Sequence, residues 1–374
     1  MRKIEMVDLK TQYQAMKSEV DSALEEVVNS TSFINGEAVL RFTEELAAFT
    51  GSRYVIPCAN GTDALQIALM ALNLDPGDEV ITSPFTFVAT AEVIALLGLK
   101  PVFVDMEEDT FNMDVNQIGQ KITSRSRCII PVHLFGQATD MEAVMKLAHQ
   151  HNVSVIEDNA QAIGAEVIFR DGTKRMAGNI GQIGTTSFYP TKNLGAYGDG
   201  GALFTQDESL AHKLKLICNH GSDRKYYYDS IGVNSRLDSV QAAILRVKLQ
   251  RLNDYANKRQ GAAALYDNLL KDTKGITIPP RASHSTHVFH QYTIRVAERR
   301  DQLKEHLASK GIPSMIYYPV PLHLSSAYMK YGYKPGDFPV AEQAAREVLS
   351  LPMHTELDEE QQTFICNSIN AFMS

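Results

Sequence analysis

The chain has 374 residues, a formal net charge of −8 at pH 7 and four cysteines. Its length exceeds the size at which a single hydrophobic core stops growing, so we expect one large and one smaller domain. The acidic balance, with both signs intermixed, argues against nucleic acid or an anionic membrane as a partner. Acidic and amide residues interrupt the N-terminus and the apolar runs are short, so neither a signal peptide nor a membrane span is predicted. We therefore expect a soluble cytoplasmic protein with reduced cysteines and no metal site.

Short apolar runs alternate with helical patterns between about residues 50 and 220. The predicted strands cover 54–57, 79–83, 101–105, 128–133 and 153–157, and the predicted helices cover 62–72, 89–97, 114–121 and 141–151. This alternation is typical of parallel strands joined by crossover helices, and nearly all-apolar strands fit a sheet covered on both faces. Residues 185–189 and 201–205 are predicted to be successive strands without a helix between them, a hairpin-like addition to the sheet.

A long polar helix is predicted from about residue 239 to 270, and it would carry the chain out of this sheet. Beyond it, a strand at 291–296 and helices at 300–309 and 342–349 form a smaller α+β unit. The predicted fold class is α/β, with a large domain over residues 1–250 and a smaller domain over 251–374. In open sheets of this kind, ligands bind beyond the carboxyl ends of the strands, and the motifs below lie there.

The first motif reads CANGTDAL at 58–65, where the first predicted strand gives way to a helix. A helix start leaves backbone N–H groups free, and together with the Thr62 hydroxyl they form an anion site suited to a phosphate. An ordinary helix N-cap at Thr62 or Asp63 would explain the same pattern.

The second motif reads PFTFVAT at 84–90, again between a strand and a helix. An aromatic side chain here, Phe87, could lie flat against a planar ring. A phenylalanine in the hydrophobic core would fit the pattern as well.

The third motif reads VIEDNAQ at 155–161, where a buried-type strand ends in two carboxylates. Carboxylates have few structural uses at such a position, but one can pair with a protonated ring nitrogen. Asp158 would do so for a pyridinium, and Gln161 would bond the phenolic oxygen of the same ring. The alternative is an N-cap together with a solvated glutamate.

The fourth motif reads TTSFYPTKNLG at 185–195 and is followed by GDGG at 198–201. A single lysine is usually a surface residue. Lys192, however, follows several hydroxyls and precedes glycines, where bulky side chains would block a cofactor. An amine that is partly desolvated beside a cationic ring has a lowered pKa, which makes it a competent nucleophile and proton carrier.

Together these motifs resemble the DegT/DnrJ/EryC1/StrS family of nucleotide-sugar aminotransferases, which are pyridoxal 5′-phosphate enzymes of fold type I. The resemblance rests on Asp158 with Gln161, on the spacing S-x-x-x-x-K-x-L-G that begins at Ser187, and on GDGG at 198–201. It extends from FING at 33–36 to YYPVPLH at 317–323, nearly the whole chain. It implies a large domain with a mostly parallel sheet covered by helices, and a smaller C-terminal α+β domain.

The resemblance also implies a role for each matching residue. Lys192 would hold the cofactor as a Schiff base and carry protons, with Asp158 at the pyridine nitrogen, Gln161 at the phenolic oxygen, Phe87 on the ring, and Gly61, Thr62 and Ser187 at the phosphate. Asn234 would reach the phosphate from the neighbouring subunit, so the family implies a homodimer with shared active sites. Asn159 departs from the small residues that are commoner at its position, which puts the local packing in question.

Within the family the chain looks most similar to enzymes that act on UDP-2-acetamido-2-deoxy-3-oxo-D-glucuronate, in the synthesis of surface polysaccharide such as lipopolysaccharide O-antigen. The narrower match lies in residues 58–67, 220–226 and 232–238. It implies glutamate as the amino donor. The candidates for binding the anionic sugar nucleotide are Arg224, Lys225, Arg236 and His323, with Tyr317 and Tyr318 at the sugar. Taken singly, each could also be a solvated charge or a half-buried aromatic.

Three other functions are alternatives to transamination. A family member that dehydrates deoxysugars carries histidine in place of Lys192, so the lysine favours transamination. A nicotinamide oxidoreductase should show G-x-G-x-x-G after its first strand, and the glycines at 178–184 have the wrong spacing. A cofactor-binding regulator that senses amines would need a DNA-binding module, and the sequence shows no motif of one.

Overall fold

Seven strands form the central sheet of the protein in the computed structural model, which describes residues 2–374. The order across the sheet is β1-β9-β8-β5-β4-β2-β3. Their bounds are β1 Tyr54–Cys58, β2 Glu79–Thr82, β3 Lys100–Phe103, β4 Ser126–Ile129, β5 Ser154–Asp158, β8 Ile183–Ser187 and β9 Gly201–Thr205. Each predicted strand of this sheet is confirmed, with ends that differ by at most four residues.

Strands β3, β2, β4, β5 and β8 run parallel. Strand β9 lies antiparallel between β8 and β1, which confirms the predicted hairpin-like addition. The carboxyl ends of β1, β2, β4, β5 and β8 meet along one edge, because β1 also runs antiparallel to β9. The fold is therefore α/β with a mostly parallel sheet, as the sequence predicts.

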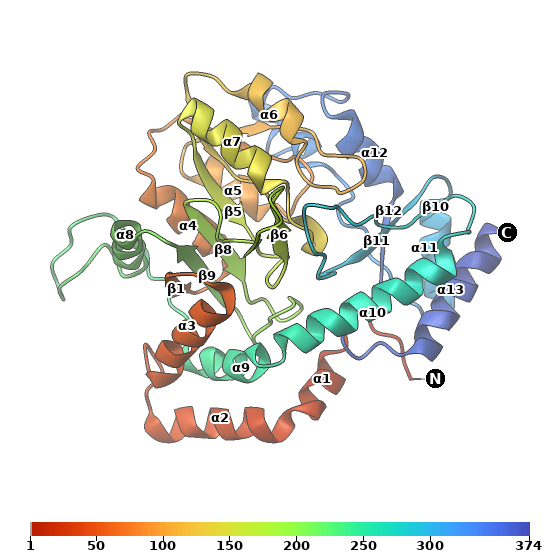
Figure 1. Ribbon diagram of the computed structural model, residues 1–374, viewed down its shortest axis with the longest axis horizontal. Helices are drawn as coiled ribbons and strands as arrows, with labels where there is room; N and C mark the ends of the chain where they lie inside the picture. The colour runs from red at the N-terminus through yellow and green to blue at the C-terminus, as the bar shows by residue number, and fades with distance from the viewer. Residues whose placement is uncertain (1) are drawn as a thin grey trace.

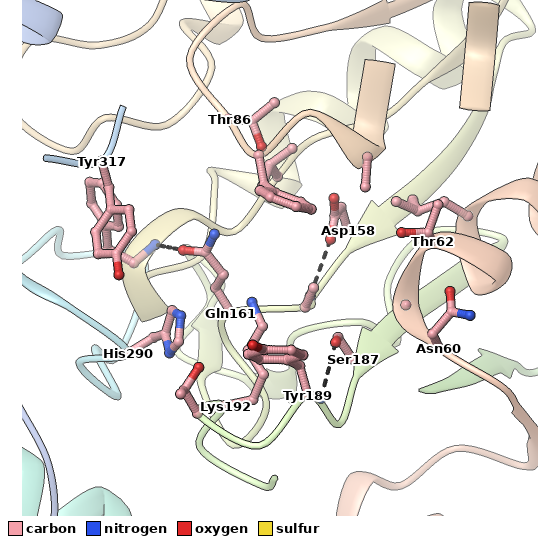
Figure 2. Close-up of a pocket in the computed structure, with 18 of the residues that line it drawn as sticks. Asn60, Thr62, Thr86, Asp158, Gln161, Ser187, Tyr189, Lys192, His290 and Tyr317 are labelled. Atoms are coloured by element: carbon pink, nitrogen blue, oxygen red, sulfur yellow. Dashed lines mark hydrogen bonds between the residues drawn. The ribbon is translucent and has the colours of Figure 1, made fainter. Parts of the chain in front are cut away.

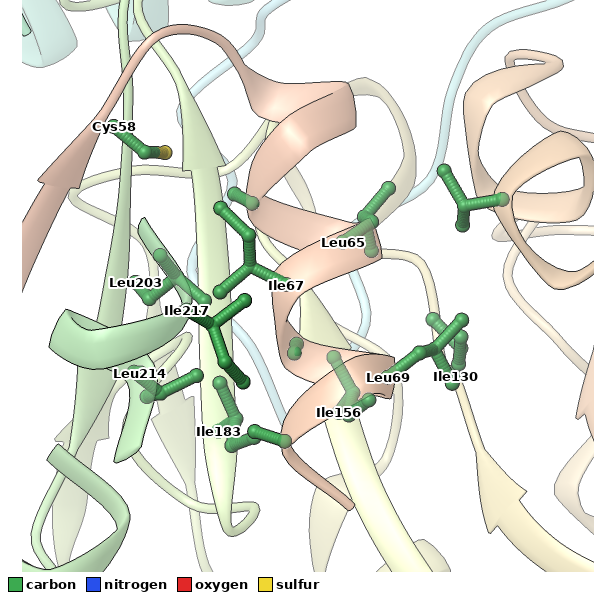
Figure 3. Close-up of a cluster of buried hydrophobic side chains, with 14 of the residues drawn as sticks. Cys58, Leu65, Ile67, Leu69, Ile130, Ile156, Ile183, Leu203, Leu214 and Ile217 are labelled. Atoms are coloured by element: carbon green, nitrogen blue, oxygen red, sulfur yellow. The ribbon is translucent and has the colours of Figure 1, made fainter. Parts of the chain in front are cut away.

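Helices cover both faces of this sheet (Figure 1). One face packs against α4 Gly61–Ala71, α5 Ala89–Leu96 and α8 Glu208–Cys218. In Figure 3, Leu65, Ile67 and Leu69 of α4 lie among side chains of the strands and of α8. The other face packs against α6 Val115–Lys121 and α7 Met141–His151, and near β1 and β9 against α3 Glu37–Thr50. Successive residues of β5 point to opposite faces, since Val155 belongs to the second cluster and Ile156 to the first.

A second sheet with a hydrophobic cluster of its own contains β10 Ile276–Thr277, β11 Tyr292–Val296 and β12 Val348–Leu351, all antiparallel. It packs with α10 Leu252–Leu270, α11 Arg300–Ser309 and α13 Glu359–Met373. This is the predicted smaller α+β unit, and Figure 1 shows α10 running from the large sheet towards it. A domain boundary at residue 250 stays a prediction.

The sequence prediction differs from the structure in two helices. The long helix over 239–270 is two helices, α9 Ser239–Leu249 and α10, because the chain turns at residues 250–251 so that Leu249 and Leu252 both bury in the same cluster. The helix predicted over 342–349 is α12 Pro339–Glu347, which begins earlier because Pro339 occupies its first turn. The fully buried residues after it form β12 instead.

Several elements have no counterpart in the sequence prediction. They are α1 Leu9–Ala15, α2 Lys17–Ser30, α3, α8, α13, the two-stranded sheet of β6 Glu166–Ile168 and β7 Lys174–Met176, and the short strands β10 and β12. Within residues 2–374, no helix combines the length and the apolar character needed to cross a membrane. The same residues hold no cluster of His, Cys, Asp or Glu that could bind a metal ion, and their four cysteines are buried and free.

A buried carboxylate fixes the end of β5, where the site residues lie. Glu157 accepts hydrogen bonds from the backbone N–H groups of Gly178, Ile180 and Gly181 at 2.8, 2.6 and 2.7 Å, and His133 Nε2 lies 2.9 Å from its Oε2. His133 Nδ1 accepts the N–H of Thr139, so the proton of the neutral ring sits on Nε2 and points at Glu157. Burial alone would raise the pKa of Glu157, but these bonds outweigh it and hold the pKa below its ordinary value.

Replacing this carboxylate should destabilise the fold. We expect Glu157→Gln to lower the free energy of unfolding by about 3 kcal/mol, because an amide places N–H groups against backbone donors that are already buried. Since the pKa is lowered in the folded protein, the contribution of Glu157 is complete above its ordinary value of 4.5 and is lost as the pH falls below it. Urea unfolding at pH 7 and pH 4 measures both effects. The same change at the exposed Glu25 is the control, and equal stabilities of the two variants at pH 7 would contradict the prediction.

Candidate active site

A cavity of about 520 Å³ opens at the carboxyl ends of the parallel strands (Figure 2). It is large enough for a cofactor and part of a substrate. Of the residues predicted to bind the cofactor, Asn234 lies outside this cavity, and the structure brings the others together in its wall, namely Gly61, Thr62, Phe87, Asp158, Gln161, Ser187 and Lys192. They come from segments up to 131 positions apart, between Gly61 and Lys192.

One end of the cavity is built to hold an anion. Helix α4 begins at Gly61, and its N-cap is Asn60, whose side chain accepts the N–H of Asp63 at 2.8 Å. The alternative that Thr62 or Asp63 caps this helix is therefore wrong. A Cβ on Gly61 would lie 2.7 Å from Ser187 Cβ, so only glycine lets the helix start approach Ser187 this closely. The free N–H groups of the helix start and the hydroxyls of Thr62 and Ser187 fit a phosphate.

Asp158 ends β5 on the face that lines the cavity. Its Oδ2 accepts the Thr90 hydroxyl at 2.7 Å and its Oδ1 accepts the N–H of Ala160 at 3.2 Å. The bond to Ala160 resembles a cap, but Ala160 begins no helix in the structure. Thr90 was missed in the sequence, although it lies in the same motif as Phe87. The neighbouring Asn159 is buried, and its amide donates to Ala177 O at 3.0 Å, so its unusual size is accommodated.

Phe87 and Lys192 both lie at the cavity rather than where the alternatives would place them. The Phe87 side chain is 55% exposed, so it is not a core residue. Lys192 lies in the loop between β8 and β9 and is not an ordinary surface lysine. Burial lowers the pKa of its amine to about 8, although the nearby Asp158 carboxylate acts in the opposite direction and raises it. The glycines after Lys192 serve the loop itself: a Cβ on Gly195 would lie 2.3 Å from Pro190 O.

Several polar residues of the wall were not predicted, and three of them lie close to the predicted site residues in the cavity: His290, Gln291 and Asp199. His290 and Gln291 come from the segment just before β11, and Asp199 comes from the glycine-rich loop. His290 Nδ1 is buried without a hydrogen-bond partner among the described residues. Burial and the nearby charges of Lys192 and Arg259 hold the pKa of His290 well below its ordinary value. No motif in the sequence connects this distant segment with the sheet.

The residues predicted to bind substrate divide into two groups. Tyr317 and Tyr318 line the cavity. His323 does not, because its side chain is fully buried, with Nε2 3.1 Å from Glu342 Oε1 and the ring packed edge-on against Phe338. The prediction that His323 touches substrate does not fit this geometry.

Arg224, Arg236 and Asn234 lie outside the cavity of their own chain. Arg224 stacks over the exposed Tyr227 ring at 3.5 Å, and Arg236 lies 3.4 Å from Asn219 Oδ1. Asn234 is exposed, whereas its neighbour Ser235 is buried and donates to Asp63 Oδ2 at 2.6 Å. Ser235 thus attaches the loop that carries these three residues to α4 behind the anion site. The side chains of Arg224, Arg236 and Asn234 lie outside the cavity.

The chemistry of these side chains matches one kind of cofactor. An anion site, an exposed aromatic ring, a carboxylate at the end of a strand and a lysine of low pKa surround a single space. A phosphorylated pyridine aldehyde needs all four: donors for its phosphate, a flat contact for its ring, an anion for its ring nitrogen and an amine for its aldehyde. The residues present therefore fit pyridoxal phosphate.

Comparison with known proteins decides the family. The model of the DegT/DnrJ/EryC1/StrS aminotransferase family matches residues 14–370. The chain belongs to this family. It is a pyridoxal 5′-phosphate-dependent sugar aminotransferase, as the sequence predicts.

Relatives of this aminotransferase carry several names. A "pleiotropic regulatory protein" of Geobacillus stearothermophilus is 48% identical over 99% of this chain and 98% of its own length. The "UDP-2-acetamido-2-deoxy-3-oxo-D-glucuronate aminotransferase" of Pseudomonas aeruginosa is 43% identical over 98% and 99%. A "dTDP-3-amino-3,4,6-trideoxy-alpha-D-glucose transaminase" of Streptomyces venezuelae is 39% identical over 98% and 95%.

Solved structures agree with the fold. An aminotransferase of the same family from Brucella abortus superposes with a TM-score of 0.94 and 41% identity, over 99% of this chain and all of the other. A Bacillus subtilis protein determined with bound pyridoxamine phosphate superposes with a TM-score of 0.88 and 30% identity, over 98% and 83%. The fold of this aminotransferase is thus that of known enzymes of this cofactor.

The low pKa of the Lys192 amine can be measured without catalysis. In cofactor-free protein we expect acylation of Lys192 to follow a midpoint near pH 8, because burial disfavours the ammonium. Asp158→Asn should lower the midpoint further, since the Asp158 carboxylate favours the charged amine. Mass spectrometry of the labelled peptide, with the exposed Lys10 as reference, gives the profile. Asp199→Asn, at the same cavity, is the matched control, and a wild-type midpoint near 10.5 would contradict the prediction.

Proposed function

We propose that this aminotransferase moves the amino group of glutamate to the keto carbon of a UDP-linked sugar in the cytoplasm, for surface polysaccharide. The substrate we favour is UDP-2-acetamido-2-deoxy-3-oxo-D-glucuronate, on which the Pseudomonas aeruginosa relative acts by its name. The observation that carries the proposal is the single cavity in which Lys192 lies with Asp158 and the anion site at Gly61. This arrangement lets one amine serve both as the cofactor's anchor and as the proton carrier.

Each residue would then have a defined task. Pyridoxal phosphate supplies, when bound, a protonated ring that accepts the electron pair released as a C–H bond breaks. Asp158 would keep the ring nitrogen protonated, and the Thr90 hydroxyl holds that carboxylate in place. Lys192 would carry the cofactor on Nζ and, once freed by the amino donor, would take the proton from the donor's Cα. A pKa near 8 leaves a useful fraction of that amine neutral at physiological pH.

The charge of the favoured substrate supports a shared active site. A UDP-linked uronate carries a pyrophosphate and a carboxylate, and each needs cationic partners. Among the described residues that line the cavity, Lys192 is the only lysine or arginine. Arg224, Arg236 and Asn234 face outward on a loop of the same chain. We propose that this loop completes the cavity of a second copy, so that the enzyme is a homodimer.

Exposed apolar side chains support the same assembly. Val28, Phe33, Ile34 and Leu40, on or between α2 and α3, are 46% to 57% exposed. Apolar residues grouped in this way mark protein interfaces more often than free surface.

A second candidate substrate is a dTDP-linked keto-deoxysugar. The Streptomyces venezuelae relative, 39% identical, carries the name of a transaminase for such a sugar. Deoxysugars lack the uronate carboxylate, so a preference for them would leave one of the proposed cationic contacts without a role.

Two reactions test the proposed function. The purified enzyme should absorb in the visible range and lose this absorbance when glutamate is added. Afterwards the UDP-linked 3-oxo-uronate should restore it faster than a dTDP-linked 3-oxo-deoxysugar. We expect Lys192→Ala to slow the glutamate step by about 10³-fold or more, whereas Lys258→Ala, at an exposed position, should not. A Lys192→Ala variant with the original rate would refute the assignment, and restoration by the dTDP sugar alone would refute the substrate.

Mixed dimers test whether the site is shared. Lys192→Ala and Asn234→Ala should each inactivate a homodimer. When the two variants are mixed, each heterodimer contains one cavity with both changes and one with neither, so activity should return to about a quarter of wild type in a statistical mixture. If Asn234 served the cavity of its own chain, the mixture would stay inactive. Mixing two separately prepared Lys192→Ala samples is the control.

A further inference from the structure

The amide of Gln161 is held at both ends. Its Oε1 accepts the N–H of Phe135 at 2.9 Å, and its Nε2 donates to the Tyr318 hydroxyl at 3.1 Å. Because a backbone N–H can only donate, the oxygen of the amide must face Phe135, and the flipped orientation is excluded. The NH₂ group has two hydrogens, and the bond to Tyr318 uses one. The second is free for a ligand of the cavity, whose wall includes Gln161.

Both partners of Gln161 belong to one aromatic cluster. Tyr318 packs edge-on against Phe85 with ring centroids 5.8 Å apart, Phe85 stacks on Phe111 at 6.2 Å, and Phe111 packs edge-on against Phe135 at 5.4 Å. Phe135 has a left-handed backbone with φ of 57° in the short turn after His133. This cluster therefore fixes the distance between the backbone N–H of Phe135 and the hydroxyl of Tyr318, the two partners of the Gln161 amide.

Tyr318 reaches Gln161 from a distant part of the chain, 157 residues further on. Its segment is fastened on both sides: Met315 exchanges backbone hydrogen bonds with Ser350 of β12 at 3.1 and 2.7 Å, and the N–H of Leu322 donates to Pro84 O at 2.8 Å. Pro84 is the first residue of the motif that contains Phe87. The Tyr318 hydroxyl is thus placed by contacts with the second sheet and with the cavity rim together.

We propose that Tyr318 is a positioning residue, which orients the Gln161 amide so that one N–H points into the cavity towards the phenolic oxygen of the cofactor. This differs from the contact with substrate predicted from the sequence. It rests on the proposed function and on the contact between Gln161 and this oxygen that the family resemblance implies. A hydrogen bond to that oxygen would withdraw negative charge that otherwise holds the proton on the neighbouring nitrogen, which Lys192 would supply. Tyr318 therefore lowers the pKa at which the lysine-linked cofactor loses this proton.

The visible absorbance of the lysine-linked cofactor as a function of pH tests this proposal. We expect Tyr318→Phe, which keeps the ring and its packing, to raise the midpoint by about 0.5 to 1 pH unit. Gln161→Ala should raise it at least as much, and adding Tyr318→Phe to Gln161→Ala should change nothing more. Tyr333→Phe is the matched control, since the Tyr333 hydroxyl is also hydrogen-bonded, to the backbone of Phe103 and Pro101, but does not touch Gln161.

A second substitution guards against a folding defect. Placing 3-fluorotyrosine at 318 keeps the hydroxyl but makes its oxygen a weaker acceptor, so the midpoint should rise by less than in Tyr318→Phe. An unchanged midpoint in Tyr318→Phe beside a raised one in Gln161→Ala would overturn the positioning role and leave the proposed function intact. An equal rise from Tyr318→Phe in the Gln161→Ala background would also overturn it, because Tyr318 would then act by another route. Wild-type protein without this absorbance would overturn the proposed function as well.

Discussion

The end of β5 is the constraint on which the site depends. Two consecutive carboxylates there point to opposite faces of the sheet. Glu157 is fully buried and takes four hydrogen bonds, which tie the strand to His133 and to the turn at 178–181. Asp158 consequently lies at a fixed place on the cavity wall. A carboxylate held in place can pair with a ring nitrogen without a cost of reorganisation when the charge of its partner changes.

The cavity combines groups that would be unstable alone. A nearby carboxylate stabilises the charged form of an amine. Burial has the larger effect here and lowers the pKa of Lys192 to about 8. The neighbouring imidazole of His290 is kept uncharged by burial and by two nearby cations. The wall is thus poor in fixed positive charge, which suits an enzyme that must release a neutral amine for proton transfer. Among the described residues of the wall, however, an anionic substrate would find no lysine or arginine other than Lys192. Completion by a second subunit would resolve this conflict.

The second sheet contributes to the same cavity. Tyr318 lies in a segment that is hydrogen-bonded to β12, and His290 lies just before β11. The Tyr318 hydroxyl accepts a hydrogen bond from Gln161, which follows β5 of the large sheet. One hydrogen-bonded amide therefore joins the two sheets at the site. Through this contact, the role proposed for Tyr318 would let a side chain of the smaller unit influence chemistry at Lys192 without touching a substrate.

The sequence by itself determined the α/β alternation, the strand ends and the motifs at Gly61, Phe87, Asp158 and Lys192, because local periodicity and turn chemistry carry that information. The same motifs also identified the family. The tertiary structure alone decided that Asn60 caps α4, that Thr90 holds Asp158, that His323 is buried against Phe338, that Tyr318 bonds Gln161, and that His290 joins the wall. These contacts connect residues far apart in the chain, and their geometry follows from packing between elements, which no local pattern encodes.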